Sequence, residues 1–282
     1  MEYIFIIGAG RSGTNLLRDI LCQFKGVETW PCDEINYIWK HGNKNHPNDE
    51  FGIDQANPKV EKYLRNKFEK FGTSKNAQLL IEKTCANSLR IPFINKVFPE
   101  GKYILLLRDG LDVSASAMKR WKAPLDLPYI YKKAKWIPKG DIPYYAIRYL
   151  VNRLKKIISK NNSLAFWGPK YQGMEEDLKS KSLLEVCALQ WSRCVVKSVS
   201  DLEKLDENKY LTVYYEQLVS DPTSEIKRIM KFTGINATES DLLKACDSVS
   251  TESLSKGNKE LPADSQQKIQ NIINPILKKY FV

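Results

Sequence analysis

The sequence is poor in the residues that build metal sites and disulfide frameworks. Its 282 residues include two histidines, His41 and His46, and six scattered cysteines without a CxxC spacing. Structural zinc sites use closely spaced Cys and His ligands, and disulfide frameworks are typical of short secreted chains. We therefore expect no metal site, and we expect the cysteines to be reduced thiols in a core.

Long apolar runs are also lacking. No run approaches the ~18 residues that a membrane-spanning helix needs. Residues 1–7 are apolar, but they have neither the basic lead-in nor the small-residue cleavage site of a signal peptide. We expect a first buried strand there, no transmembrane segment, and a cytoplasmic location.

Positive charge is in excess and is unevenly distributed. The net charge is +11, and residues 101–180 hold 16 Lys and Arg against 7 Asp and Glu. Such a bias favours an anionic partner: nucleic acid, an acidic glycan, a phospholipid surface or a polyanionic nucleotide. A solvated basic face without a ligand is the alternative.

Strands and helices alternate along the chain. Short β-rich apolar runs predict strands at 3–7, 78–82, 102–107 and 210–214. Helical spacing of apolar residues predicts helices at 14–24, 88–97, 111–119, 183–205, 223–233, 239–247 and 265–280. This order predicts an α/β fold, a parallel central sheet flanked by helices, in a single domain over 1–282. Segment 122–182, rich in Lys, Tyr, Trp and Pro, interrupts the alternation; within it only 144–159 looks helical. It is interpreted as a basic, aromatic-rich insertion or lid.

A glycine-rich loop joins the first predicted strand to the first predicted helix. Gly8 and Gly13 have P-loop spacing, and glycines let successive backbone N–H groups face one anion at a helix N-terminus. Thr14 stands where a nucleotide triphosphatase needs Lys, so ATP hydrolysis fits poorly. Arg11 offers a planar fork for phosphate oxygens. We expect a P-loop-like nucleotide fold; a glycine turn without a ligand is the alternative.

Three motifs together resemble one family. Residues 11–17, Arg-Ser-Gly-Thr-Asn-Leu-Leu, resemble the 5′-phosphosulfate loop of sulfotransferases that use 3′-phosphoadenosine 5′-phosphosulfate (PAPS). Residues 103–113 resemble the second signature, a strand ending in Arg-Asp, with Ser116 eight residues beyond the Arg. Residues 214–222 resemble a third stretch, closest to its form in tyrosylprotein sulfotransferases. The three lie in the family's order across 8–222, whereas 122–182 matches nothing in it.

The resemblance implies an activity. It implies in-line transfer of a sulfuryl group from PAPS to a hydroxyl of a glycan, lipid, small molecule or peptide tyrosine, without a metal or nucleic acid, leaving 3′-phosphoadenosine 5′-phosphate (PAP). The basic segment 122–182 would then be an acceptor-side lid suited to an anionic glycan or lipid. Two alternatives remain: a P-loop nucleotide or sugar kinase, and a basic nucleic-acid-binding protein that uses 122–182.

The resemblance also assigns the nucleotide site. Arg11 with Thr14 and Asn15 would hold the 5′-phosphate, Arg108 and Ser116 the 3′-phosphate, and Tyr215 would lie by the adenine. Arg108 ends a strand and Ser116 lies two turns into the next helix, so both can face the crevice beyond the strand ends. An ion pair of Arg108 with Asp109 or Asp112 is the alternative. The full predicted nucleotide set is Gly10, Arg11, Ser12, Gly13, Thr14, Asn15, Arg108, Ser116, Tyr215, Ser253 and Lys256.

Two residues are implied as catalytic, Lys83 and Glu34. Lys83 matches the family lysine at the bridging oxygen, but the cytosolic Lys-Thr-His triplet here reads Lys83-Thr84-Cys85, and a neutral thiol is a poor base. Glu34 lies where glycan and tyrosylprotein sulfotransferases place a catalytic Glu, and we expect burial to raise its pKa. The alternatives for the base are Asp33, Glu28, His41 and His46; a solvated acidic turn at 33–34 is the alternative without function.

Overall fold

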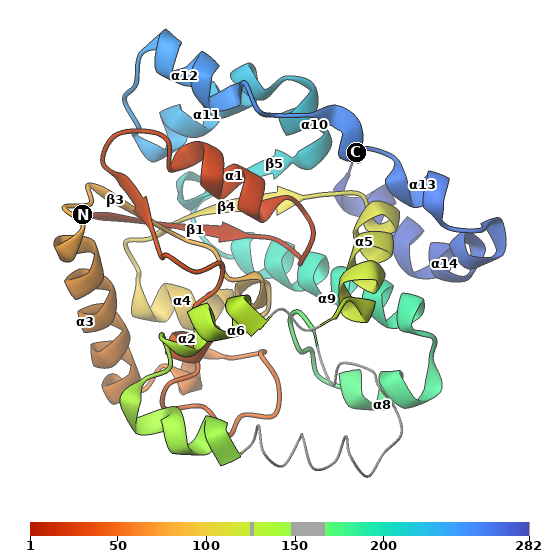
Figure 1. Cartoon of the computed structure of the whole chain (residues 1–282), viewed down its shortest axis with the longest axis horizontal. Helices are drawn as coiled ribbons and strands as arrows, with labels where there is room; N and C mark the ends of the chain where they lie inside the picture. Colours follow the sequence, from red (N-terminus) through yellow and green to blue (C-terminus); the bar gives the residue numbers. More distant parts are fainter. Residues whose placement is uncertain (125–126, 148–166, 282) are drawn as a thin grey trace.

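The computed structural model of the chain describes residues 1–124, 127–147 and 167–281, and its centre is a sheet of parallel strands (Figure 1). The strands follow the order β2-β3-β1-β4-β5. Their bounds are Glu2–Ile7 for β1, Val27–Thr29 for β2, Leu79–Glu82 for β3, Lys102–Leu107 for β4 and Tyr210–Tyr214 for β5. The predicted parallel sheet is confirmed, and each of the four predicted strands is present.

The strand that the sequence did not predict is β2, at one edge of the sheet. It has three residues, pairs with β3 alone, and includes two polar residues, Glu28 and Thr29. The hydroxyl of Thr29 donates to the carbonyl of Ile81 at 3.0 Å, which adds a side-chain bond to a short ladder. A strand this short has too few residues to show the period-2 or apolar pattern from which strands are recognised.

Helices cover both faces of the sheet, and the side chains of β1 point alternately into the two cores between them. Ile4 and Ile6 point into one core, Phe5 and Ile7 into the other, and all four side chains are fully buried. A strand buried on both faces is expected to be apolar throughout, as a parallel sheet between helices requires. The same division continues in β4, where Ile104 belongs to the first core and Leu105 to the second.

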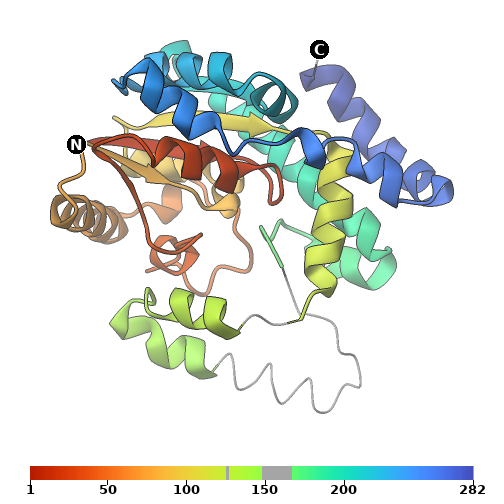
Figure 2. The ribbon, with the colours of Figure 1, turned by 45° about the horizontal axis from the view of Figure 1, so that its top comes forward.

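The helices divide between these two cores (Figures 1 and 2). On the first face lie α1 (Thr14–Leu21), α10 (Tyr215–Ser220), α11 (Pro222–Thr233) and α12 (Glu239–Cys246). On the second lie α3 (Pro58–Ser74), α4 (Ile91–Val97), α5 (Gly110–Lys122), α9 (Leu183–Leu202) and α14 (Ala263–Tyr280). Shorter helices are α2 (Asn36–Trp39), α6 (Leu127–Ala134), α8 (Met174–Ser180) and α13 (Lys256–Glu260). Helices α3 and α10 were not predicted; the other helices of the two faces were, with ends shifted by a few residues.

The described part of segment 122–182 includes a stretch, residues 127–147, that lies against residues 30–44 (Figure 2). The ring of Trp136 meets that of Trp30 edge-on, with centroids 5.2 Å apart. Asp141 is buried; its carboxylate lies 2.7 Å from His41 Nδ1 and 3.0 Å from Lys44 Nζ. Residues 142–147 are helical, and the rest of the helix predicted at 144–159 lies outside the described residues.

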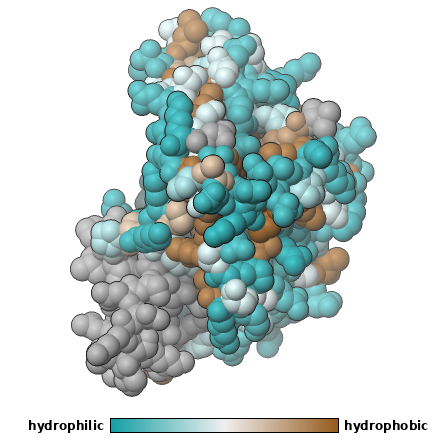
Figure 3. Space-filling model, turned by 90° about the vertical axis from the view of Figure 1, so that its right-hand side faces the viewer, coloured by the Kyte–Doolittle hydropathy of each residue, from teal (hydrophilic) through white to brown (hydrophobic). Residues whose placement is uncertain are grey.

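The surface of the described residues gives no sign of a membrane span. None of their helices combines the length and the apolar character needed to cross a bilayer. On the face that includes α13 and α14, hydrophilic side chains predominate and apolar ones are scattered (Figure 3).

Candidate active site

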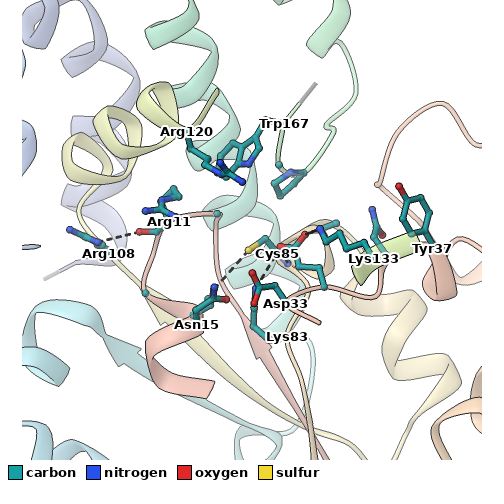
Figure 4. A pocket seen from close by; sticks show the side chains of 18 of the residues that line it. Arg11, Asn15, Asp33, Tyr37, Lys83, Cys85, Arg108, Arg120, Lys133 and Trp167 are labelled. Atoms are coloured by element: carbon teal, nitrogen blue, oxygen red, sulfur yellow. Dashed lines mark hydrogen bonds and ion pairs between the residues drawn. The ribbon is translucent and has the colours of Figure 1, made fainter. Parts of the chain in front are cut away.

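A pocket of about 820 Å³ opens at the carboxyl ends of β1, β3 and β4 (Figure 4). Strand β1 lies between β3 and β4: the chain runs from β1 outward to β2 and β3 on one side and then crosses to β4 on the other. Ligands of open α/β sheets bind where the strand order switches in this way. The predicted residues that line this pocket are Gly10, Arg11, Gly13, Thr14, Asn15, Glu34, Lys83, Arg108, Tyr215 and Ser253. Ser12, Ser116 and Lys256 are not part of the lining.

The glycine loop between β1 and α1 has a backbone that few side chains tolerate. Gly13 has a φ of 90°, and a Cβ atom there would lie 2.3 Å from a ring carbon of Tyr215. Arg11 also has a positive φ, 77°, which is uncommon for a residue with a side chain. Ser12 is buried and its N–H donates to the carbonyl of Ala9 at 3.1 Å, so the turn closes on itself. Strain of this kind is frequent at ligand-binding loops.

Arg108 ends β4 and is buried at the inner wall of the pocket. Its guanidinium donates to the carbonyl of Ser253 at 2.7 Å and to that of Arg11 at 3.2 Å, and it lies 4.2 Å from the ring centroid of Tyr215. Its contact with Asp112 is longer, 3.4 Å. The Nε of Arg108 is buried without a hydrogen-bond partner among the described residues. Such an unsatisfied donor on a cation fits an anionic ligand.

The other predicted partner for Arg108, Asp109, serves helix α5 instead. Its carboxylate accepts from the N–H groups of Leu111 and Asp112 at 2.8 and 3.1 Å, which caps the N-terminus of the helix. Asp112 in turn accepts from the N–H of Ser255 at 2.9 Å and of Gly257 at 2.7 Å. These bonds hold the segment after Ser250 against α5, beside the pocket.

Positive charge gathers around Arg11. Its Nε donates to the hydroxyl of Ser116 at 2.9 Å, so Ser116 reaches the pocket through Arg11. Arg120 lies one turn beyond Ser116 on α5 and lines the pocket (Figure 4). Burial lowers the pKa of the Arg11 guanidinium, and the nearby charges of Arg120 and Arg108 lower it further. Like charges brought together in a pocket favour an anion between them.

Arg120 was missed by the sequence analysis, although a signal was present. It follows Ser116 by four residues, the spacing that puts two side chains on one face of a helix. Lys256, by contrast, was predicted at the nucleotide and begins helix α13 with an exposed side chain. The hydroxyl of Ser253 forms a hydrogen bond with that of Tyr215, so this part of the segment does close over the loop.

Glu34 and Lys83, the two residues predicted as catalytic, lie together at the end of β3. Glu34 Oε1 lies 3.7 Å from Lys83 Nζ and accepts from the N–H of Cys85 at 3.2 Å. Its Oε2 accepts from Lys133 Nζ at 3.3 Å. Burial would raise the pKa of Glu34, but the charges of Lys83 and Lys133 outweigh it and lower the pKa to about 2. The expectation of a raised pKa was therefore wrong, because it took no account of two lysines meeting one carboxylate.

The alternative bases are engaged elsewhere. Asp33 lines the pocket but accepts from Arg18 at 3.2 Å. His41 is bound to Asp141, and the ring of His46 lies 3.2 Å from the carbonyl of Asn48; neither histidine lines the pocket. Glu28 lies within β2, also outside the lining. Of the acidic and histidine candidates, Glu34 is the one in contact with Lys83.

Cys85, the third residue of the Lys83-Thr84-Cys85 triplet, lines the pocket. Its Sγ lies 3.8 Å from the hydroxyl of Thr14, the residue that begins α1. Burial raises the pKa of the Cys85 thiol to about 12, and the neighbouring carboxylate of Glu34 acts in the same direction. The thiol is therefore neutral at physiological pH and is a poor proton acceptor.

The outer half of the pocket is lined by aromatic and basic side chains. Tyr37 and Tyr145 meet edge-on, with ring centroids 4.7 Å apart. Trp167 lies over the glycine loop. A Cβ atom added to Gly10 would lie 3.1 Å from the ring of Trp167. Of the aromatic residues that stand out in 122–182, Tyr145 and Trp167 line the pocket, and the side chain of Tyr129 lies outside the described part of the chain.

Known proteins resemble this chain over most of its length. Protein-tyrosine sulfotransferase A of Caenorhabditis elegans is 24% identical over 246 residues, which are 83% of this chain and 50% of the relative. The chain thus spans about half the length of that curated relative. Among solved structures, the sulfotransferase domain from the curacin biosynthetic pathway has a TM-score of 0.54 at 14% identity, with 97% of each chain covered.

Two further solved structures share the fold. A sulfotransferase from Mycobacterium avium has a TM-score of 0.55 at 11% identity, covering 100% of this chain and 77% of that one. A mouse sulfotransferase complexed with PAP has a TM-score of 0.51 at 12% identity, covering 99% and 85%. The family model described as the sulfotransferase domain matches residues 2–278. The chain therefore belongs to the sulfotransferase domain family, as its three motifs predicted.

Proposed function

We propose that this protein transfers the sulfuryl group of PAPS to a hydroxyl of an acceptor and releases PAP. The observation that carries the proposal is the meeting of two groups of side chains in one pocket: the arginines around Arg11, and the pair Lys83 and Glu34. Family membership favours this function over the kinase and nucleic-acid alternatives. A kinase would also need a lysine where the loop has Thr14.

The inner half of the pocket would hold the nucleotide. Arg11, Thr14 and Asn15 belong to the loop at the start of α1, where backbone N–H groups and the helix dipole favour a phosphate. Arg108 and Arg120 would bind the 3′-phosphate; the buried Nε of Arg108 and the absence of a carboxylate partner for Arg120 among the described residues support this. Ser116, one turn before Arg120 on α5, would join these arginines at the 3′-phosphate; its hydroxyl also accepts from Arg11 at 2.9 Å, which links the two phosphate sites.

Glu34 and Lys83 would share the chemistry. As the acceptor oxygen bonds to sulfur, Glu34 takes the hydroxyl proton. The bond from sulfur to the 5′-phosphate oxygen breaks, its electron pair stays on that oxygen, and Lys83 stabilises the charge that develops there. With a pKa of about 2, Glu34 is a weak base while it contacts both lysines. When Lys83 turns to the phosphate oxygen, one of these charges leaves the carboxylate and its basicity rises.

The outer half of the pocket would receive the acceptor. Tyr37, Tyr145 and Trp167 offer flat faces on which a sugar or a phenol can stack, and Lys40 and Lys133 bring positive charge to the same space. This supports the role of segment 122–182 as an acceptor-side lid within a single domain over 1–282. An anionic glycan or lipid fits the charge, and a peptide tyrosine fits the aromatic walls. A cytoplasmic location belongs to the same proposal.

A transfer assay tests the proposal. The protein is incubated with radiolabelled PAPS, EDTA and, in separate reactions, a desulfated glycosaminoglycan, 2-naphthol, a glycolipid in micelles and a tyrosine peptide. We expect label on at least one acceptor, retained in EDTA because Arg11, Arg108 and Lys83 supply the positive charge, and lost in Glu34→Gln. Transfer that stops in EDTA and returns with Mg²⁺ would contradict the metal-free mechanism. Absence of label on every acceptor, together with equal binding of PAP and AMP, would overturn the proposal.

A further inference from the structure

Helix α6 contributes one side chain, Lys133, to the charges around Glu34. Lys133 Nζ lies 3.3 Å from Glu34 Oε2, and the two side chains are 21% and 23% exposed. The other oxygen, Oε1, faces Lys83 Nζ at 3.7 Å and the N–H of Cys85 at 3.2 Å. Each carboxylate oxygen therefore has partners of its own. Figure 4 shows Lys133 reaching into the pocket beside Cys85 from the side of Tyr37.

We propose that Lys133 is a positioning residue for the transfer reaction: its ion pair with Oε2 keeps Oε1 of Glu34 turned towards Lys83 and sets how readily the carboxylate takes a proton. This inference rests on the proposed role of Glu34 as the base. It adds a residue of segment 122–182, outside the motifs of the family resemblance, to the machinery of the reaction.

The two lysines differ in what else they are needed for. Lys83 follows β3, is buried, and is required at the leaving oxygen during transfer. Lys133 comes from the acceptor side and can stay with Oε2 while Lys83 turns away. Without either lysine, the carboxylate would keep the N–H of Cys85 as its one partner among the described residues, and its greater basicity would be offset by a less well fixed orientation. Lys133 thus supplies orientation at the moment when Lys83 is occupied.

The remaining charges near Glu34 do not duplicate this contact. Asp33 is bound to Arg18 at 3.2 Å. In the described part of the chain, the buried Arg90 forms no ion pair with Glu34: its Nε donates to Asn87 at 2.8 Å, its guanidinium lies over the rings of Trp39 and Phe51, and its two terminal nitrogens have no hydrogen-bond partner there. Burial raises the pKa of the neighbouring thiols, to about 11 for Cys32 and about 12 for Cys85, so both are neutral near physiological pH. Among the described residues, the cations paired with this carboxylate are Lys83 and Lys133, and the N–H of Cys85 donates to it. Asp33, Arg90 and Cys32 are further titratable groups nearby, Cys32 through its contact with the carbonyl of Glu34.

A carboxyl titration measures the effect directly, without an acceptor. Protein containing carbon-13 glutamate is titrated by NMR, and the Glu34 signal is identified by its loss in Glu34→Gln. In the wild type we expect Glu34 to stay ionised well below the ordinary range for Glu. An opposite charge at this distance lowers a carboxyl pKa by about one to three pH units. In Lys133→Gln, Glu34 should therefore titrate at least about one pH unit higher.

Matched variants separate this effect from a general loss of charge or structure. Lys133→Arg should titrate like the wild type, because it restores the cation. Lys132→Gln removes the same charge from the exposed neighbouring position on α6 and should leave Glu34 unchanged. PAP affinity should stay within about twofold of wild type in all three variants, since the nucleotide half of the pocket is untouched.

Two kinds of failure can be told apart. If PAP binds and Glu34→Gln is inactive, but Glu34 titrates alike in Lys133→Gln and wild type, the inference about Lys133 is wrong and the proposed function stands. The inference is also wrong if Lys132→Gln moves Glu34 as far as Lys133→Gln does. If PAP does not bind, or Glu34→Gln keeps its turnover, the proposed function fails whatever the titration shows.

Discussion

The two halves of the pocket are built in different ways. The inner half, where we propose that the nucleotide binds (the nucleotide half), is made by short stretches at strand ends: the loop after β1, Arg108 at the end of β4, and Tyr215 just after β5. The outer half, where we propose that the acceptor binds (the acceptor half), is made by segments far apart in sequence, where Tyr37 meets Tyr145 and Glu34 meets Lys133. Local backbone geometry shapes each stretch of the first half, which long-range contacts such as Arg108 with Ser253 then join, whereas the second half depends on long-range packing throughout.

The two halves therefore meet different structural requirements. A phosphate site needs N–H groups and arginines at fixed positions, which a strand, a tight turn and a helix supply within a few residues. An acceptor site has to match one particular molecule, so its wall can change without disturbing the sheet. We therefore expect substitutions in one half to leave the function of the other half largely intact.

The largest expected effect is a loss of turnover on substitution of Glu34 or Lys83, which lie where the two halves of the pocket meet. Glu34→Gln should lower turnover by about 10²–10⁴-fold, the usual contribution of general base catalysis. Lys83→Ala should also lower turnover, through lost stabilisation of the leaving oxygen. PAP affinity should change little in Glu34→Gln. Steady-state kinetics and calorimetric PAP titration of the same samples check this.

The controls for these variants are Asp33→Asn and Cys85→Ala, which should be milder. Asp33 is bound to Arg18, and the Cys85 thiol is neutral. Loss of turnover in Asp33→Asn, with turnover retained in Glu34→Gln, would show that the base lies one residue earlier. Full turnover in both would put the base outside this segment.

A second substitution acts on the nucleotide half alone. Gly13→Ala places a Cβ against the ring of Tyr215 on a left-handed backbone, so the loop has to shift. We expect PAP affinity to fall by about ten- to a hundredfold, since strain and overpacking of this kind cost about 1–3 kcal/mol. Gly173→Ala is the matched control: Gly173 has a φ of 89° and nothing within 4 Å of a new Cβ. Equal loss of PAP affinity in both variants would contradict the account.

The two carboxylates beside Lys83 should respond to pH in opposite directions. Burial raises the pKa of Glu82 to about 6, against hydrogen bonds from Thr84 and Asn87, whereas the pKa of Glu34 is lowered. The stability that protonated Glu82 contributes is present below pH 4.5 and is lost as pH rises through 6. This loss should be about 2 kcal/mol.

Denaturant unfolding at pH 4.5 and pH 7 measures this contribution. Relative to wild type, Glu82→Gln should show a smaller fall in the free energy of unfolding between the two values. The same fall in both proteins would show that Glu82 is ionised throughout. The contribution of Glu34 has the other sign: it is present above pH 4.5 and is lost only as pH falls towards 2.

A smaller effect is expected from Arg120, whose side chain is half-buried in the pocket. Arg120→Ala should weaken PAP binding by about tenfold, because a hydrogen bond to a charged group contributes about 1.5 kcal/mol. It should weaken AMP binding much less. Lys119→Ala is the control, because Lys119 pairs with Glu260 at the surface. An equal loss of PAP and AMP affinity in Arg120→Ala would place this arginine elsewhere than at the 3′-phosphate.

The same contrast explains which parts of the fold and of the site could be predicted from the sequence. Strands β4 and β5 begin and end at the predicted residues. The apolar run of β4 marks a buried strand clearly, and β5, only partly buried at the edge of the sheet, is marked by its β-branched and aromatic residues. Helix α3 was overlooked although Asn57 caps it, Pro58 begins it, and Val60, Leu64 and Phe68 form its buried face. The glycine loop between β1 and α1 could be recognised in the sequence from its glycines.

The acceptor half could not be predicted in this way. No local pattern tells that Lys133 lies against Glu34, since 99 residues separate them. The pKa of Glu34 is lowered by its contacts with Lys83 and Lys133, both distant in sequence, so the direction of its shift is opposite to the one expected. Arg120 is intermediate: its helical spacing from Ser116 was readable, but its place in the pocket depends on how α5 packs.

The central claim is that the inner pocket recognises a 3′-phosphorylated adenine nucleotide. Thermal unfolding of the wild-type protein with PAP, AMP or ATP tests it most directly. At about a hundred times its dissociation constant, PAP should stabilise the fold by about 2.7 kcal/mol and raise the melting temperature by about 5 °C, while AMP and ATP at the same concentration barely change it. Equal stabilisation by PAP, AMP and ATP would contradict the assignment of Arg108, Ser116 and Arg120 to the 3′-phosphate.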